Sequence, residues 1–284
     1  MAAPRPPAVP VLHLSADRLR RALADLVASA RPTGGVEGYV TALHLKSALF
    51  AEVLADGGRA MTETEFLDLC AFMAPVRRRI GALLADAGFA SVQARIVTLL
   101  QEGPLDARMA RFIASFPPGK ALRWVRDLAA EILHFTRPEA LPLMARWVWD
   151  ARVGTGVLRE IWHAEDVDRA RIDVPDNLLT FTTLRGELDG FLQAEGIFRD
   201  RHFHVDLLLG HIYAGYINDR GGQYLRNDFT HEGDPMLHTR RMLGLDGVNT
   251  ETGRTRLRLI DGRAHEFGGG PDARQSLRDA HAHS

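Results

Sequence analysis

The chain of 284 residues contains a single cysteine, Cys70. One thiol excludes an intrachain disulfide and any structural zinc site built from several thiolates. Both exclusions fit a reducing compartment, so we expect a cytoplasmic protein. Cys70 stands in the apolar segment Phe-Leu-Asp-Leu-Cys-Ala-Phe-Met, which predicts a buried core residue with a raised pKa and not a nucleophile.

Long hydrophobic runs are also missing. Residues 207–217 are the kind of apolar stretch that could suggest a span, but they are too short and include a histidine. We therefore expect a soluble protein with no membrane partner. The first 14 residues hold four prolines and one arginine, which is not the layout of a secretory signal.

Lysine is scarce, with only Lys46 and Lys120, and the formal net charge is −1. No global positive field favours a nucleic-acid backbone, so a nucleic-acid partner is disfavoured. The weakest of three functional hypotheses places such binding at Arg254, Arg256 and Arg258. A dinucleotide fingerprint, a Walker A motif and a serine-hydrolase elbow are all absent, which disfavours those nucleotide-binding and hydrolase classes.

Apolar residues make up 46% of the chain and recur with a helical period over its first two thirds. Ser15 is placed to cap the first helix, and Thr62-Glu63-Thr64-Glu65 has the form of a capping box. We expect helices at about 16–30, 37–55, 62–86 with a kink at Pro75, 91–101, 105–116, 120–135, 139–150, 177–195, 200–218 and 235–244.

This pattern predicts a mainly α fold of multi-helix, bundle-like domains with a short β or irregular C-terminal extension. An acidic loop near residue 168 is the best internal boundary. We divide the chain into a disordered leader at 1–14, an N-terminal helical domain at 15–168, a C-terminal helical unit at 169–244, and an irregular or short-strand extension with a mobile tail at 245–284.

The most distinctive stretch runs from His202 to His238 and holds five of the twelve histidines among several acidic residues. Imidazole and carboxylate side chains bind divalent ions and transfer protons. We predict metal ligands here and a weaker role for Glu232 as an acid or base. The candidate ligands are His202, His204, Asp206, His211, His231 and His238.

A structural alternative explains the same residues without chemistry. In that interpretation His204 and His211 are partly buried helix residues, and His202 and Asp206 form a surface pair. Asp234 then caps the next helix, since Asp is a favoured N-cap residue.

Two Glu-x-x-His pairs form a rival ligand set: Glu131 with His134, and Glu160 with His163. Each pair would share one helical face, as in carboxylate-bridged di-iron bundles. The 29 positions between the pairs are fewer than two intervening helices require, so the likeness is to a motif alone. Hydrogen bonding or salt bridging on a helix surface is the competing explanation.

Two functions follow from these observations. The first is a cytoplasmic accessory or regulatory protein that acts through contacts with a protein partner and has a candidate metal site. The alternative is a non-haem metal-dependent enzyme with iron or zinc held by His, Asp and Glu side chains. The sequence leaves substrate, partner and oligomeric state open.

Overall fold

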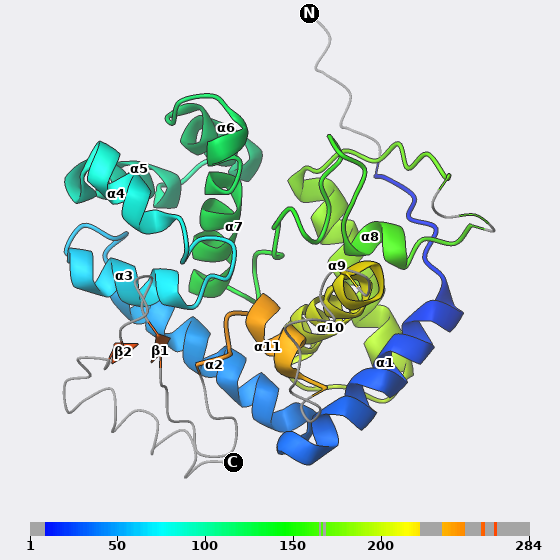
Figure 1. Ribbon diagram of the computed structural model, residues 1–284. Helices are drawn as coiled ribbons and strands as arrows, with labels where there is room; N and C mark the ends of the chain where they lie inside the picture. The colour runs from blue at the N-terminus through cyan, green and yellow to red at the C-terminus, as the bar shows by residue number, and fades with distance from the viewer. Residues whose placement is uncertain are drawn as a thin grey trace, which may run out of the picture.

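The structure, a computed structural model, describes residues 9–164, 166, 169–221, 235–247, 257–258 and 264–265, without the side chains of 218–221, 257–258 and 264–265. It confirms the mainly α fold (Figure 1). The helices are α1 (Ala16–Ala30), α2 (Gly35–Val53), α3 (Glu63–Ala71), α4 (Ile80–Ala87), α5 (Phe89–Leu100), α6 (Leu105–Ala114), α7 (Val125–Thr136), α8 (Val157–Glu160), α9 (Leu178–Ala194), α10 (Arg201–Gly221) and α11 (Leu237–Met242). Two 3-10 turns lie at Arg31–Thr33 and Lys120–Leu122, and β1 (Leu257–Arg258) pairs antiparallel with β2 (Ala264–His265).

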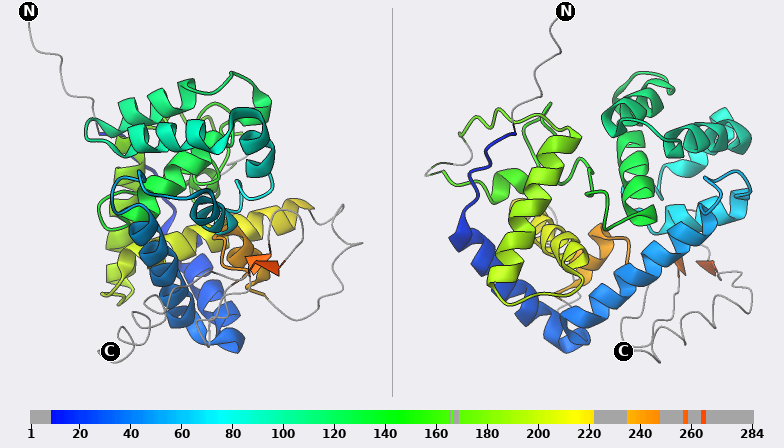
Figure 2. Two further views of the ribbon diagram at one scale, coloured as in Figure 1. Left: turned by 90° about the vertical axis from the view of Figure 1, so that its left-hand side faces the viewer. Right: turned by 180° about the vertical axis from the view of Figure 1, so that it is seen from behind.

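Helix α2 connects the two sides of the helical body, since it contacts both α7 and α10. In Figure 1, α3 to α6 gather on one side with α7, while α8 and α9 surround α10 on the other. Figure 2 shows from behind that α11 lies between α10 and α2. One continuous apolar core runs through both sides and includes Leu43, Leu128 and Leu208.

Side chains cap three helix starts, and the caps at α1 and α3 are the predicted ones. The Ser15 side chain accepts from the backbone N–H of Arg18, and Asn177 does the same for Thr180 at the start of α9. At α3, Thr62 and Glu65 form a complete capping box. These side chains satisfy backbone donors that a helix start leaves unpaired, which is why the sequence located them.

The single kinked helix predicted at 62–86 is wrong. Helix α3 ends at Ala71, and turns connect it to α4, which begins at Ile80. Pro75 lies within this connection and has no backbone N–H to continue a helix. The break leaves the backbone carbonyl of Phe72 facing Gly244.

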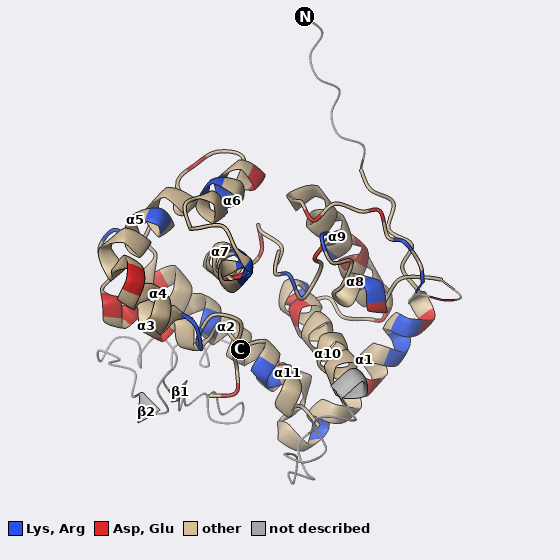
Figure 3. Ribbon diagram, turned by 45° about the horizontal axis from the view of Figure 1, so that its top comes forward, with Lys and Arg blue, Asp and Glu red and all other residues tan. Residues whose placement is uncertain are grey.

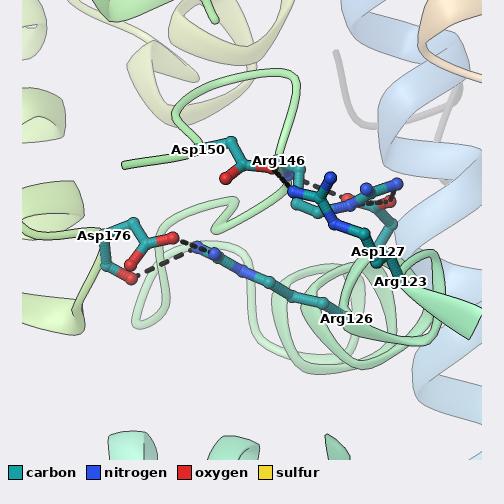
Figure 4. A network of polar contacts seen from close by, with 6 residues as sticks. All are labelled: Arg123, Arg126, Asp127, Arg146, Asp150 and Asp176. Carbon is teal, nitrogen blue, oxygen red and sulfur yellow. Dashed lines mark hydrogen bonds and ion pairs between the residues drawn. The ribbon is translucent and has the colours of Figure 1, made fainter. Parts of the chain in front are cut away.

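The helix predicted at 139–150 is also wrong, because the chain there forms turns and an isolated bridge between Asp150 and Thr155. Ion pairs with the start of α7 and its approach hold this segment in place (Figure 4). The buried Asp127 carboxylate accepts from the backbone N–H and the guanidinium of Arg146 at 2.7–2.9 Å, and Arg123 donates to Asp150 at 2.7 Å. Tertiary hydrogen bonds of this kind override a helical sequence period.

Residues 9–14, which we assigned to a disordered leader, run extended along the body. Leu12 is buried, and Leu14 forms an antiparallel bridge to Trp162. Residues 1–8 lie outside the described residues, and the division of the chain at residue 168 stays a prediction. No single helix in the described part is long and apolar enough to cross a membrane; the bent pair α4 and α5 meets that test by length and composition only.

Candidate functional site

A buried polar cluster lies where α2, α7 and α10 meet, and we call Lys46, Glu131, His134 and Asp206 the core polar cluster. Lys46 is fully buried on α2 and donates to Glu131 Oε2 on α7 at 2.7 Å and to the carbonyl oxygen of Leu243 at 2.9 Å. Its ammonium also lies 3.7 Å from the centroid of the Phe135 ring. Lys46 thus has two hydrogen-bond acceptors and one aromatic face for its three N–H groups.

Burial dominates the ionisation of this pair. Desolvation lowers the pKa of Lys46 and raises the pKa of Glu131, and the attraction between the two groups opposes each shift without cancelling it. Asp206 adds a further negative charge that favours the charged lysine. Both pKa shifts favour the neutral forms of the two groups. The pair therefore contributes less to the free energy of folding than its short distance suggests.

His134 lies one turn after Glu131 on α7, and both of its ring nitrogens face acceptors. Nδ1 lies 2.7 Å from the carbonyl oxygen of Leu141, and Nε2 lies 2.8 Å from Asp206 Oδ2 on α10. His134 and Asp206 are almost fully buried. These two contacts hold the imidazole ring between α7, the chain at Leu141 and α10.

The two rival ligand sets therefore meet in one cluster. Asp206 comes from the histidine-rich stretch, and His134 comes from the Glu-x-x-His set. The predicted surface pair of His202 with Asp206 is wrong for the aspartate, which lies in the core. His202 is half buried at the start of α10, and burial lowers its pKa while Asp206 acts in the opposite direction.

The remaining described histidines of the stretch contact different parts of the fold. His204 Nδ1 donates to the carbonyl oxygen of Asp200 at 3.1 Å. His211 links two helices, with Nε2 2.8 Å from Asp25 Oδ2 on α1 and Nδ1 3.0 Å from Thr239 Oγ1 on α11. His238 is on α11, where burial and then the charge of Arg241 lower its pKa.

The second Glu-x-x-His pair does not share a helical face as predicted. Helix α8 is four residues long and ends at Glu160, so His163 lies beyond it and is exposed. The backbone carbonyl of Glu160 accepts from Arg18, and the backbone N–H of His163 donates to His13 at 2.6 Å. These bonds attach the segment to α1 and to the extended chain at 9–14.

Metal binding stays a prediction. Across the residues that the structure describes, no three His, Cys, Asp or Glu side chains are grouped to hold an ion. His231 and Glu232 lie outside those residues, and so does Asp234, the predicted cap of the last helix. A metal held by His211 would have to replace one of the hydrogen bonds that this histidine makes to Asp25 and Thr239.

Sequence reasoning missed Lys46, although a signal was present. Tyr39, Leu43, Lys46 and Phe50 follow each other at spacings of four, three and four, so the lysine stands in the apolar face of α2. A lysine at such a position needs a buried acceptor. Cys70 was interpreted correctly: it is fully buried, and burial with the nearby charge of Glu131 raises its pKa well above 9.0.

Comparison of this chain with protein-family models, with curated proteins and with solved structures found no match.

Proposed function

We propose that this protein is an accessory or regulatory protein that binds another protein through its surface. One observation carries the proposal: Phe198, at the turn between α9 and α10, has 65% of its surface exposed. Aromatic side chains on a rigid support are frequent anchors of protein interfaces. Along α1, basic and acidic residues are mixed (Figure 3).

The turn that carries Phe198 is held from several directions. The backbone N–H of Ile197 donates to Leu192 at 2.9 Å, and Arg201 donates to Asp189 at 2.7 Å. Asp200 has a φ of 47°, a conformation that a residue with a side chain adopts at a cost, and its carboxylate lies 2.9 Å from His44 Nε2. A fixed turn presents the aromatic ring with little entropy to lose on binding.

The experiment is quantitative affinity capture with the full chain and two matched variants. Phe198→Ser removes the exposed ring, and Val153→Ser removes another exposed apolar side chain, 54% exposed, from a different turn. We expect a protein that is retained by the wild type and by Val153→Ser but lost with Phe198→Ser. With the purified partner, titration calorimetry should show at least about tenfold weaker binding for Phe198→Ser.

Two results would overturn the proposal. One is a set of captured proteins that is identical for all three chains. The other is near-stoichiometric iron or zinc in protein purified without a chelator, lost on changing His204 and His211 to alanine, which would favour the metal-dependent enzyme.

A further inference from the structure

Residues 235–247, which include α11, lie across the core polar cluster, and we call them the strap. Polar contacts between the strap and the body include Thr239 with His211, the Leu243 carbonyl with Lys46, and Asp246 with Arg77 at 2.6 Å. Helix α11 packs along α10 (Figure 2). The strap therefore supplies one of the two hydrogen-bond acceptors of the buried lysine.

The fit of the strap depends on two glycines. A Cβ on Gly244 would lie 1.7 Å from the carbonyl oxygen of Phe72, and the residue has a φ of +72°. On α10, a Cβ on Gly210 would come within 2.9 Å of the Leu243 side chain. At both glycines the backbone thus lies directly against its neighbours, next to the Leu243 carbonyl that accepts from Lys46.

We infer that the strap is a releasable cover, and that its opening exposes Lys46 as a reactive primary amine beside the Glu131 carboxylate. This inference stands apart from the proposed partner binding, because it uses no residue of the Phe198 turn.

Two features favour opening of the strap. Helix α11 has six residues, too few to be stable alone, so it depends entirely on its docking contacts. Opening also returns water to Lys46 and Glu131. Burial penalises the charged forms of both groups, so the free energy gained when the pair is hydrated offsets part of the free energy of the contacts that are lost.

Acylation of lysine amines can test this inference, because the chain has few lysines. Lys46 and Lys120 are the only lysines, and Lys120 is exposed. Brief acylation of the full chain with an N-hydroxysuccinimide acetate at pH 8, read by mass spectrometry, gives the rate at Lys46 relative to Lys120. We expect Lys46 to react at least about tenfold more slowly, but at a measurable rate in conditions where the protein stays folded.

Two glycine variants separate the strap from general destabilisation. Gly244→Ala drives the strap from the Phe72 carbonyl, whereas Gly88→Ala has the same positive φ, +75°, with nothing within 4 Å of its Cβ. We expect acylation of Lys46 to rise at least tenfold in Gly244→Ala and to change less than twofold in Gly88→Ala. If Gly244→Ala fails to fold, Asp246→Asn, which breaks the ion pair with Arg77, should raise the rate about threefold.

Hydrogen exchange on the wild type provides a second measurement. The amides of 235–247 should exchange faster than those of the central turns of α7, with a weaker dependence on denaturant. The inference is overturned if Lys46 is acylated only in step with global unfolding, is not acylated at all below the unfolding transition, or reacts as fast as Lys120 in the wild type.

Discussion

The two Glu-x-x-His segments have the same spacing and opposite environments. On α7, Glu131 and His134 are both buried and bond to side chains on α2 and α10. At α8, the helix ends at the glutamate, and His163 is exposed. The spacing of a motif therefore specifies a shared helical face only if the helix is long enough to contain both residues. Burial of that face depends on neighbours that are remote in sequence.

The two segments should differ most in the free energy of unfolding that is lost when the glutamate of each is removed. Glu131→Ala leaves the Lys46 ammonium buried without its carboxylate, which should lower the free energy of unfolding by about 3–5 kcal/mol. Glu160→Ala, at a partly exposed position, should lower it by about 1 kcal/mol or less. Urea unfolding followed by circular dichroism measures both. Equal losses would show that the Lys46–Glu131 pair is not the difference between the two segments.

A double substitution sharpens this result. In Lys46→Met with Glu131→Leu, both charges leave the core together, and apolar side chains of similar length replace them. Most of the stability lost in Glu131→Ala should return, because no unpaired buried charge remains. A double variant as unstable as the single one would mean that shape and not charge governs this position.

The next largest difference in stability is expected when the histidine of each segment is removed. His134→Ala removes the donor to Asp206 and leaves a buried carboxylate without it, at a cost of about 2–3 kcal/mol. His163→Ala changes an exposed side chain and should stay within about 0.5 kcal/mol of the wild type. Thermal unfolding at fixed pH compares the two, and a melting temperature that falls equally in both variants contradicts the assignment.

The smallest expected effect is the pH dependence that the Lys46–Glu131 pair adds to stability. The folded-state pKa of Glu131 is raised, so its contribution is present below its ordinary value of 4.5 and is lost as pH rises through the folded value. The folded-state pKa of Lys46 is lowered, so its contribution is present above its ordinary value of 10.5 and is lost as pH falls through the folded value.

Subtracting the curve of the Lys46→Met, Glu131→Leu double variant from that of the wild type isolates these contributions. The difference should decrease as pH rises above 4.5 and increase again as pH approaches 10.5. Urea midpoints measured across this range provide the test. A flat difference would mean that neither group changes its pKa on folding.

The helix starts were predictable from sequence because caps act locally. Ser15, and Thr62 with Glu65, bond to backbone N–H groups within three residues, so spacing alone identified them. The failures at 62–86 and 139–150 have a different origin. Asp127 is 19 residues from Arg146, and the two hydrogen bonds from the Arg146 guanidinium to Asp127 Oδ2 hold in place a segment whose periodicity indicated a helix.

By itself, then, the sequence determined a mainly α fold, several helix starts, and the burial of Cys70. The tertiary structure alone decided which polar groups meet: His134 with Asp206, 72 residues away, and Lys46 with the backbone carbonyl of Leu243, 197 residues away. The physical reason is the range of the forces that act. Capping and periodicity join residues one turn apart, whereas a buried charge requires whichever partner the packing of distant helices brings within 3 Å.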